Sequence, residues 1–134
     1  MSIKNPIIIN QDKQVHFDVD DTLVMWDDNF REPGPGKVEF IDPHDGTKLY
    51  LTPHKKHIQK LRGHSRTGWY VVVWSAGGWE WAETVIRGLG LLAHVDMVMS
   101  KPLKCYDDLP VGEGIGPREW YCDKKTGETN ENQG

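Results

Sequence analysis

The sequence predicts an α/β fold with a mostly parallel central sheet, and three observations support this prediction. Apolar runs typical of strands alternate along the chain with segments whose apolar residues recur at helical spacing. The run 69–74 is apolar without interruption, which is typical of a parallel strand covered on both faces. The segment that follows it places apolar residues on one side of a helix, namely Trp79, Ala82, Ile86 and Leu89, with Gly90 as its stop.

The first half of the chain predicts one core strand followed by a hairpin. Residues 14–18 alternate between polar and apolar side chains and end in carboxylates, so they form the expected first core strand. A short apolar run, 7–9, precedes them. Residues 27–36 contain Pro-Gly pairs and cannot continue a regular element. A hairpin is expected over 37–52, because its two alternating segments flank an Asp-Gly turn.

A helix is expected after the hairpin. The Thr-Pro pair at 52–53 is typical of an N-cap followed by the first helical residue. Ile58 and Leu61 would form its buried stripe, and the helix should end near Gly63 or Gly68.

Two further strands complete the predicted architecture, a buried one at 97–99 and a short one around 103–106. Together the elements predict a Rossmann-like three-layer sandwich with a mostly parallel central sheet and an inserted β-hairpin flap at about 37–52. We expect a single domain over 1–125, and the polar composition of 126–134 predicts a disordered tail. Sheets of this kind hold their sites outside the carboxyl ends of their strands.

Composition limits the possible functions of these 134 residues. The net charge of −4 argues against a general nucleic-acid coat, although a local basic patch remains possible. No apolar run approaches the roughly 18 residues of a membrane span, so no membrane partner is expected. Cys105 and Cys122 are too few for a disulfide scaffold, and the first residues lack the order of a secretion signal. We therefore expect a cytoplasmic protein.

Carboxylates follow two of the predicted strands. Asp18 and Asp20 stand two residues apart at a strand end and project to the same side, while Asp107 and Asp108 close the last predicted strand. Two such charges about 4 Å apart repel by about 4 kcal/mol at an effective dielectric near 20, so a convergent cluster needs protons or a cation. Oxygen ligands with room for water suit Mg²⁺. The sequence thus predicts a magnesium site.

Two other strand ends hold a hydroxyl and an ammonium, those of Ser75 and Lys101. A hydroxyl, a lysine and a magnesium ion are suited to holding a phosphoryl group and spreading its charge. A carboxylate nucleophile splits the transfer into two easier steps, and a second carboxylate can protonate the leaving oxygen and later activate water. This combination predicts phosphoryl transfer.

These residues give the chain a resemblance to the haloacid dehalogenase (HAD) superfamily of Mg²⁺-dependent phosphohydrolases. Its first motif, Asp-x-Asp-x-Thr after an apolar strand, is matched by Asp18, Asp20 and Thr22. Ser75 looks like the second motif, Lys101 like the third, and the pair Asp107-Asp108 like the fourth, so the motifs occur in family order. Lys104 is a weaker candidate for the lysine. The matches span residues 14–108.

The resemblance implies a role for each matched residue. Asp18 would be the nucleophile and Asp20 the general acid and base, with Lys101 as a further catalytic residue. The phosphate-binding set would be Thr22, Ser75, Ala76 and Lys101. The metal set would be Asp18, Asp20 through its backbone carbonyl, and Asp107 and Asp108, with either of the last two as the direct ligand. The implied function is a phosphatase that hydrolyses a phosphomonoester, a nucleotide or a nucleic-acid end, through an aspartyl-phosphate intermediate.

Other residues have simpler interpretations. His54 and His57 have no further ligand at zinc spacing, so we place them on a solvated helix face. The basic residues of 55–66 form a solvated face or a site for a polyanionic substrate. Six tryptophans are present; Trp69, Trp74 and Trp81 are interpreted as core residues, while Trp26 or Trp79 could border the site and stack on a base.

Two alternatives from other classes are open. One is a HAD-like interaction protein with weak or no catalysis, which the small size permits. The other is a phosphorylation-switched receiver module, which needs an acceptor aspartate at the end of a middle strand, where this chain has Ser75. The sequence makes no prediction of the oligomeric state.

Overall fold

Six strands form two separate sheets in residues 13–108, which are the residues that the computed structural model describes. The first sheet is parallel, with strand order β1 (Gln14–Asp18), β5 (Tyr70–Ser75) and β6 (Met97–Ser100). Asp18 pairs with Trp74 and Ser75 with Ser100, so the three strands end together. The parallel strands expected at 14–18, 69–74 and 97–99 are thereby confirmed to within a residue.

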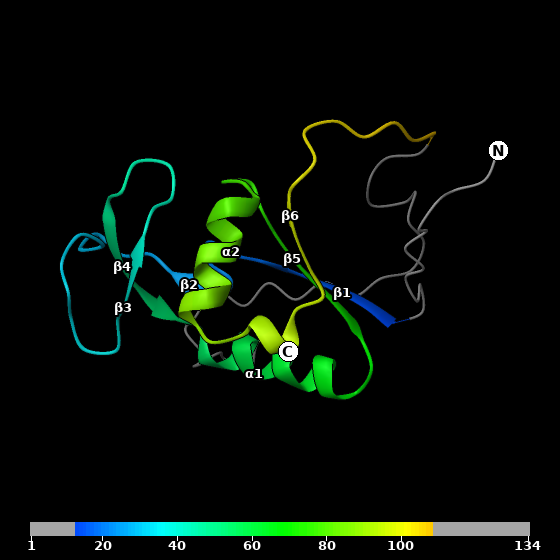
Figure 1. The fold of residues 1–134 in the computed structure, drawn as a ribbon, viewed down its shortest axis with the longest axis horizontal. Coiled ribbons are helices and arrows are strands. Elements are labelled where there is room, and N and C mark those ends of the chain that lie inside the picture. The colour runs from blue at the N-terminus through cyan, green and yellow to red at the C-terminus, as the bar shows by residue number, and fades with distance from the viewer. Residues whose placement is uncertain (1–12, 109–134) are drawn as a thin grey trace, which may run out of the picture.

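The second sheet is antiparallel, with order β2 (Val24–Met25), β4 (Lys48–Pro53) and β3 (Val38–Ile41). Its β3–β4 pair is the hairpin expected at 37–52, and Gly46 in the turn has φ +79°. Figure 1 shows this sheet beside the parallel one, with a helix between them. The described residues therefore have a mixed α/β fold.

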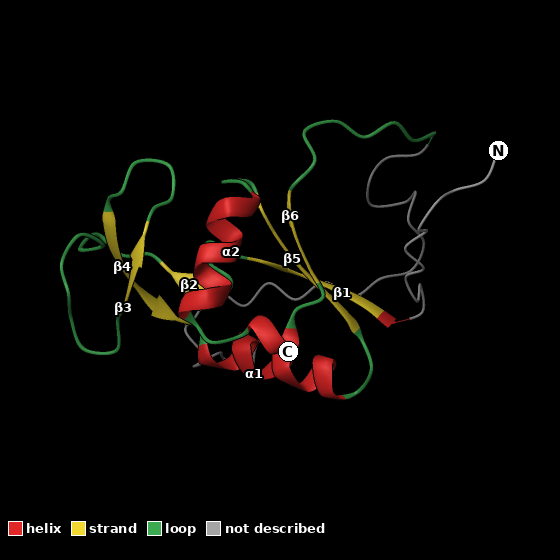
Figure 2. Ribbon diagram, in the orientation of Figure 1, coloured by secondary structure: helices red, strands yellow, loops and turns green. Residues whose placement is uncertain are grey.

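Two α-helices connect the parallel strands within the described range: α1 (Lys55–Arg66) lies between β1 and β5 in sequence, and α2 (Trp79–Gly88) between β5 and β6. A 3₁₀ turn, η2 (Leu92–His94), follows α2. Figure 2 shows these helices in red beside the strands, and α2 contacts β3 of one sheet and both β5 and β6 of the other. Helix α2 is therefore the element that joins the two sheets.

The core lies between the helices and the parallel sheet. Phe17 of β1 and the alternate residues Val71 and Val73 of β5 are buried there. Helix α1 contributes the predicted stripe of Ile58 and Leu61. Helix α2 contributes Trp81, Ala82, Val85 and Ile86. Trp81 is only 5% exposed, which confirms its assignment to the core, whereas Trp69 and Trp74 are only partly buried.

The start of α1 differs from the prediction. Thr52 and Pro53 do not begin the helix, because they pair with β2 and so belong to β4. The N-cap is His54, whose Nδ1 accepts a hydrogen bond of 3.1 Å from the backbone N–H of His57. An imidazole nitrogen thus caps the helix N-terminus, a role that the side-chain oxygen of Ser, Thr, Asp or Asn usually has. The helix then passes Gly63 and ends at Arg66.

The prediction of a strand around 103–106 is wrong. Residues 101–108 form no strand, and Leu103 and Tyr106 are 99% and 94% exposed. Lys104 and Cys105 separate these two apolar residues, so the segment has no continuous apolar face to bury. The expectations for 7–9, Cys122 and the tail 126–134 lie outside the described residues. Within the described part, no helix is long and apolar enough to span a bilayer.

Candidate active site

The candidate site lies where the strands of the parallel sheet end. Asp18 closes β1, Ser75 closes β5, and Lys101 follows the last residue of β6. The backbone N–H of Lys101 donates to the Ser75 carbonyl at 2.9 Å, which joins the ends of β5 and β6. Because neighbouring parallel strands end at one edge, three residues far apart in sequence are brought together there, as the sequence predicts.

Asp18 is held by two groups. Its Oδ1 lies 3.1 Å from the Lys101 ammonium, and its Oδ2 accepts a hydrogen bond of 3.4 Å from the Thr22 hydroxyl. The side chains of Lys101 and Asp18 are 37% and 34% exposed, so solvent and small molecules reach this ion pair. The carboxylate is therefore both oriented and accessible.

A tight turn after β1 holds Asp18, Asp20 and Thr22 at this edge. The Val19 carbonyl accepts hydrogen bonds from the N–H groups of Thr22, Leu23 and Val24, at 2.9 to 3.2 Å. Val19 and Leu23 are fully buried and anchor the turn in the core. Asp21 is the one non-glycine residue with positive φ, +59°, among those described. We call residues 19–24 the acidic turn.

Asp20 is held by two tryptophans. The indole N–H groups of Trp26 and Trp81 both donate to Oδ1 of Asp20, each at 2.9 Å. Trp81 comes from α2 and is buried, whereas Trp26 follows β2 and is partly buried. Of the two tryptophans that the sequence offered for this position, Trp26 and Trp79, it is Trp26 that borders the site. The hydrogen bond from Trp81 was not expected from the sequence. The large number of tryptophans was the only feature of the sequence that could have indicated this contact.

The loop after β5 encloses Ser75. The Ser75 side chain is fully buried, and its Oγ accepts a hydrogen bond of 3.0 Å from the Gly77 N–H. A Cβ on Gly77 would lie 3.3 Å from that oxygen, a tighter approach than most Cβ atoms make, so a larger residue there would press on Ser75. Ala76 is exposed in the same turn. Helix α2 begins just beyond, and the positive end of its dipole adds to the charge of Lys101 at this edge.

The hairpin reaches this loop. His44, in the turn between β3 and β4, donates from Nε2 to the Gly77 carbonyl at 3.2 Å. This contact joins the hairpin turn to the loop after β5 and places the tip of the expected flap at the site. No local signal in the sequence marks His44 for this position.

Two histidines fasten the acidic turn to α1. The Nδ1 of His57 donates to the Thr22 carbonyl at 2.8 Å, and the backbone N–H of His54 donates to the Leu23 carbonyl at 2.8 Å. Their rings are stacked, with centroids 3.7 Å apart. The prediction that His54 and His57 lie on a solvated helix face is wrong, since they are 0% and 4% exposed. Their helical spacing to Ile58 and Leu61 could have identified them as buried.

Asp107 and Asp108 do not form a group of metal ligands with Asp18 and Asp20 within the described residues. Both are exposed in the irregular segment after β6. Residues 13–108 contain no group of three or more His, Cys, Asp or Glu side chains that could hold a metal ion. The physical reason is the missing strand at 103–106, which was expected to deliver the two carboxylates to the sheet edge. The described site therefore brings together Asp18, Asp20, Thr22, Ser75 and Lys101.

Comparisons of this chain with protein-family models, with curated proteins and with solved structures found no match. The interpretation of the site consequently depends on its own geometry.

Proposed function

We propose that this chain is a phosphatase that hydrolyses phosphomonoesters through an aspartyl-phosphate intermediate on Asp18. The observation that supports it best is the state of that carboxylate, which ends a parallel strand, is about one-third exposed, and contacts Lys101 and Thr22. We further propose that the described elements belong to a Rossmann-like three-layer sandwich of the HAD type, in which such a strand end holds the nucleophile.

The reaction would proceed in two displacements. A carboxylate oxygen of Asp18 forms a bond to phosphorus while the ester oxygen leaves, and Asp20 gives that oxygen its proton. Asp20, now ionised, takes a proton from water, whose oxygen attacks phosphorus and releases inorganic phosphate and the Asp18 carboxylate. The two indoles on Asp20 Oδ1 orient this carboxyl group and leave Oδ2 for the proton, since no hydrogen bond to Oδ2 occurs among residues 13–108.

Lys101 and the α2 terminus would stabilise the transferred group. The ammonium that now contacts Asp18 can also contact phosphoryl oxygens as charge spreads over them. The positive end of the α2 dipole lies at the same edge. Ser75 is buried against Gly77, so it would shape the loop, while the exposed Ala76 would present its backbone to the phosphoryl group.

Mg²⁺ would be held by two oxygen donors, the Asp18 carboxylate and the Asp20 backbone carbonyl, since the Asp20 carboxylate is engaged by the two indoles and by the proton transfer. This set fits Mg²⁺, which keeps several waters and is usually bound by one or two carboxylates together with substrate phosphate. When bound, the ion would offset negative charge on the phosphoryl group. The proposed metal set is accordingly Asp18 and Asp20, without Asp107 and Asp108.

The substrates we propose are nucleotides or nucleic-acid ends, acted on in the cytoplasm. The site lies at an open sheet edge, and the hairpin turn reaches it through His44, which suits a small flap over a phosphorylated end.

The test is release of phosphate from p-nitrophenyl phosphate and from a panel of nucleotides, with Mg²⁺ and with EDTA. We expect hydrolysis with Mg²⁺ and its loss in Asp18→Asn. Asp28→Asn is the matched control, since Asp28 is exposed in the turn after β2. Hydrolysis that survives Asp18→Asn would overturn the mechanism.

A second candidate is a HAD-like interaction protein with weak or no catalysis. It is favoured by the position of Asp107 and Asp108, which leaves no group of three potential metal ligands in the described part of the chain. Absence of hydrolysis on every substrate of the panel, with partner binding equal in wild type and Asp18→Asn, would select this alternative.

A further inference from the structure

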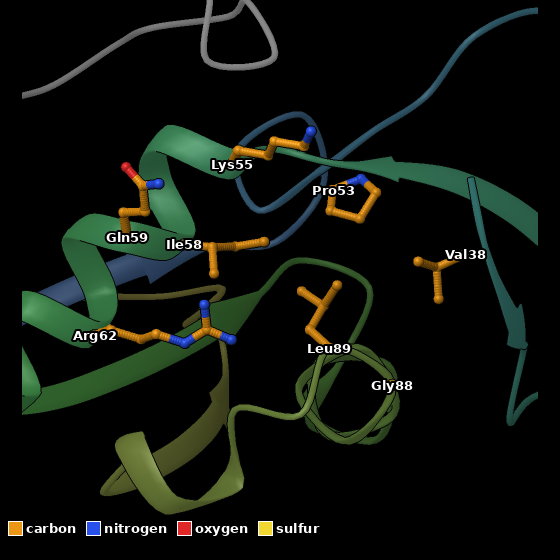
Figure 3. Close-up of a pocket in the computed structure, with 8 residues that line it drawn as sticks. All are labelled: Val38, Pro53, Lys55, Ile58, Gln59, Arg62, Gly88 and Leu89. Carbon is orange, nitrogen blue, oxygen red and sulfur yellow. The ribbon is translucent and has the colours of Figure 1, made fainter. Parts of the chain in front are cut away.

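A groove separate from the candidate active site lies between α1, α2 and the hairpin. Its volume is about 310 Å³, near the lower end of the range of roughly 300–1,000 Å³ for ligand sites. Figure 3 shows α1 along one side, with the end of α2 and the hairpin strands across from it. None of its lining residues contributes a side chain to the acidic turn or to the loop after β5.

The floor of the groove is aliphatic. Ile58 from α1, Leu89 from the end of α2, and Val38 and Pro53 from the hairpin line it. Its shape is fixed at Gly88, where an added Cβ would lie only 2.6 Å from the Phe40 ring. This close contact between α2 and β3 forms one side of the groove.

Two cations flank that floor. Lys55 and Arg62 extend from α1 toward the groove on either side of Ile58 (Figure 3). Neither has an acidic partner within 4.0 Å in the described range. They stand seven residues apart, on one face of the helix and about 10 Å along its axis.

The positive charge at the start of α1 does not stabilise the helix itself. The sequence has no Asp or Glu between Asp45 and Glu80, although the whole chain has net charge −4. Lysines 55 and 56 stand at the start of α1, where the helix dipole disfavours positive charge, and the first turn has no acidic residue. An anionic partner outside the helix would account for this placement.

We propose that the groove binds an acidic segment of a partner protein in polyproline II conformation. Its aliphatic side chain would fill the floor, and two carboxylates would pair with Lys55 and Arg62. Because a polyproline II segment has three residues per turn and rises about 3.1 Å per residue, carboxylates three residues apart lie on the same side and about 9 Å apart, close to the spacing of the two cations. A nucleic acid fits less well, since the lining has no aromatic ring on which a base could stack.

The test is a fluorescence-anisotropy titration of the full chain with a labelled peptide that contains Glu-Leu-Leu-Glu between Gly-Ser flanks. We expect saturable binding that weakens about tenfold or more in Lys55→Gln/Arg62→Gln, as charge-assisted pairs are lost. The matched control is Lys56→Gln/Arg66→Gln, which removes the same charge from the same helix outside the groove and should weaken binding less than about threefold. The peptide with Ser-Ser in place of Leu-Leu should also bind about tenfold less tightly.

Three outcomes would overturn the proposal. One is no saturation at about 1 mM peptide, the weak limit for a specific contact. The second is an equal loss in both double variants, which would indicate diffuse electrostatics. The third is tighter binding of a labelled single-stranded oligonucleotide with the same dependence on Lys55 and Arg62. The proposal does not rest on phosphatase activity.

Discussion

The indole N–H of Trp81 donates a hydrogen bond of 2.9 Å to Oδ1 of Asp20, across 61 residues of sequence. Trp26 donates to the same oxygen at the same distance. Two rigid donors, one in α2 and one just after β2, therefore hold one carboxylate near Asp18, the last residue of β1. This arrangement makes Trp81 a positioning residue for Asp20 as well as a core residue.

Trp81→Phe keeps an aromatic ring in the core and removes the N–H. Because hydrogen bonds to charged groups contribute about 1.5–3 kcal/mol, we expect a loss of stability of that order in urea denaturation. If the proposed function holds, kcat should fall with little change in KM, since Asp20 moves protons and does not bind substrate. Trp79→Phe is the control, because Trp79 is 50% exposed. An equal effect of both substitutions would contradict the positioning role.

Lys101→Gln removes the ammonium that contacts Asp18. We expect the rate of phosphate release to fall by about 10²-fold or more, the usual effect of removing a group that stabilises developing charge. Stability should change by less than about 1 kcal/mol, because the pair is more than one-third exposed on average. Lys104→Gln, in the irregular segment after β6, should leave the rate unchanged. A large loss in Lys104→Gln alone would transfer the role to Lys104.

Magnesium should stabilise the folded chain through Asp18 and Asp20. At about 100 times its dissociation constant, a ligand specific to the native state adds about 2.7 kcal/mol, which thermal melts in Mg²⁺ and in EDTA would detect. Asp18→Asn should reduce the difference between the two conditions, while Asp108→Asn should preserve it. A response lost in Asp108→Asn would restore that residue to the metal set.

Two glycines of the helices should respond oppositely to alanine. Gly88→Ala brings a Cβ to 2.6 Å from Phe40, and such overpacking destabilises by about 1–3 kcal/mol. Gly63→Ala lies inside α1 with no atom within 4 Å of the added Cβ, so helix propensity should stabilise the chain by about 0.5–1 kcal/mol. Chemical denaturation of the two variants measures both effects. A destabilised Gly63→Ala would contradict this account of α1.

The sequence by itself determined the local elements. The alternation at 14–18, the apolar run at 69–74 and the Asp-Gly turn of the hairpin each depend on neighbours within a few residues, and each predicted its element to within a residue or two. The strand ends also placed Asp18, Ser75 and Lys101 at one edge, because parallel strands must end together. The segment 103–106 had no such pattern, and its predicted strand did not form.

Only the tertiary structure decided which distant groups meet. The indole of Trp81 on Asp20, the imidazole of His57 on the Thr22 carbonyl and the ring of His44 on the Gly77 carbonyl join residues 61, 35 and 33 positions apart. Periodicity shows that a side chain faces the interior, but it does not show which partner it finds there. That choice depends on how α1, α2 and the hairpin pack together, which no short stretch of sequence encodes.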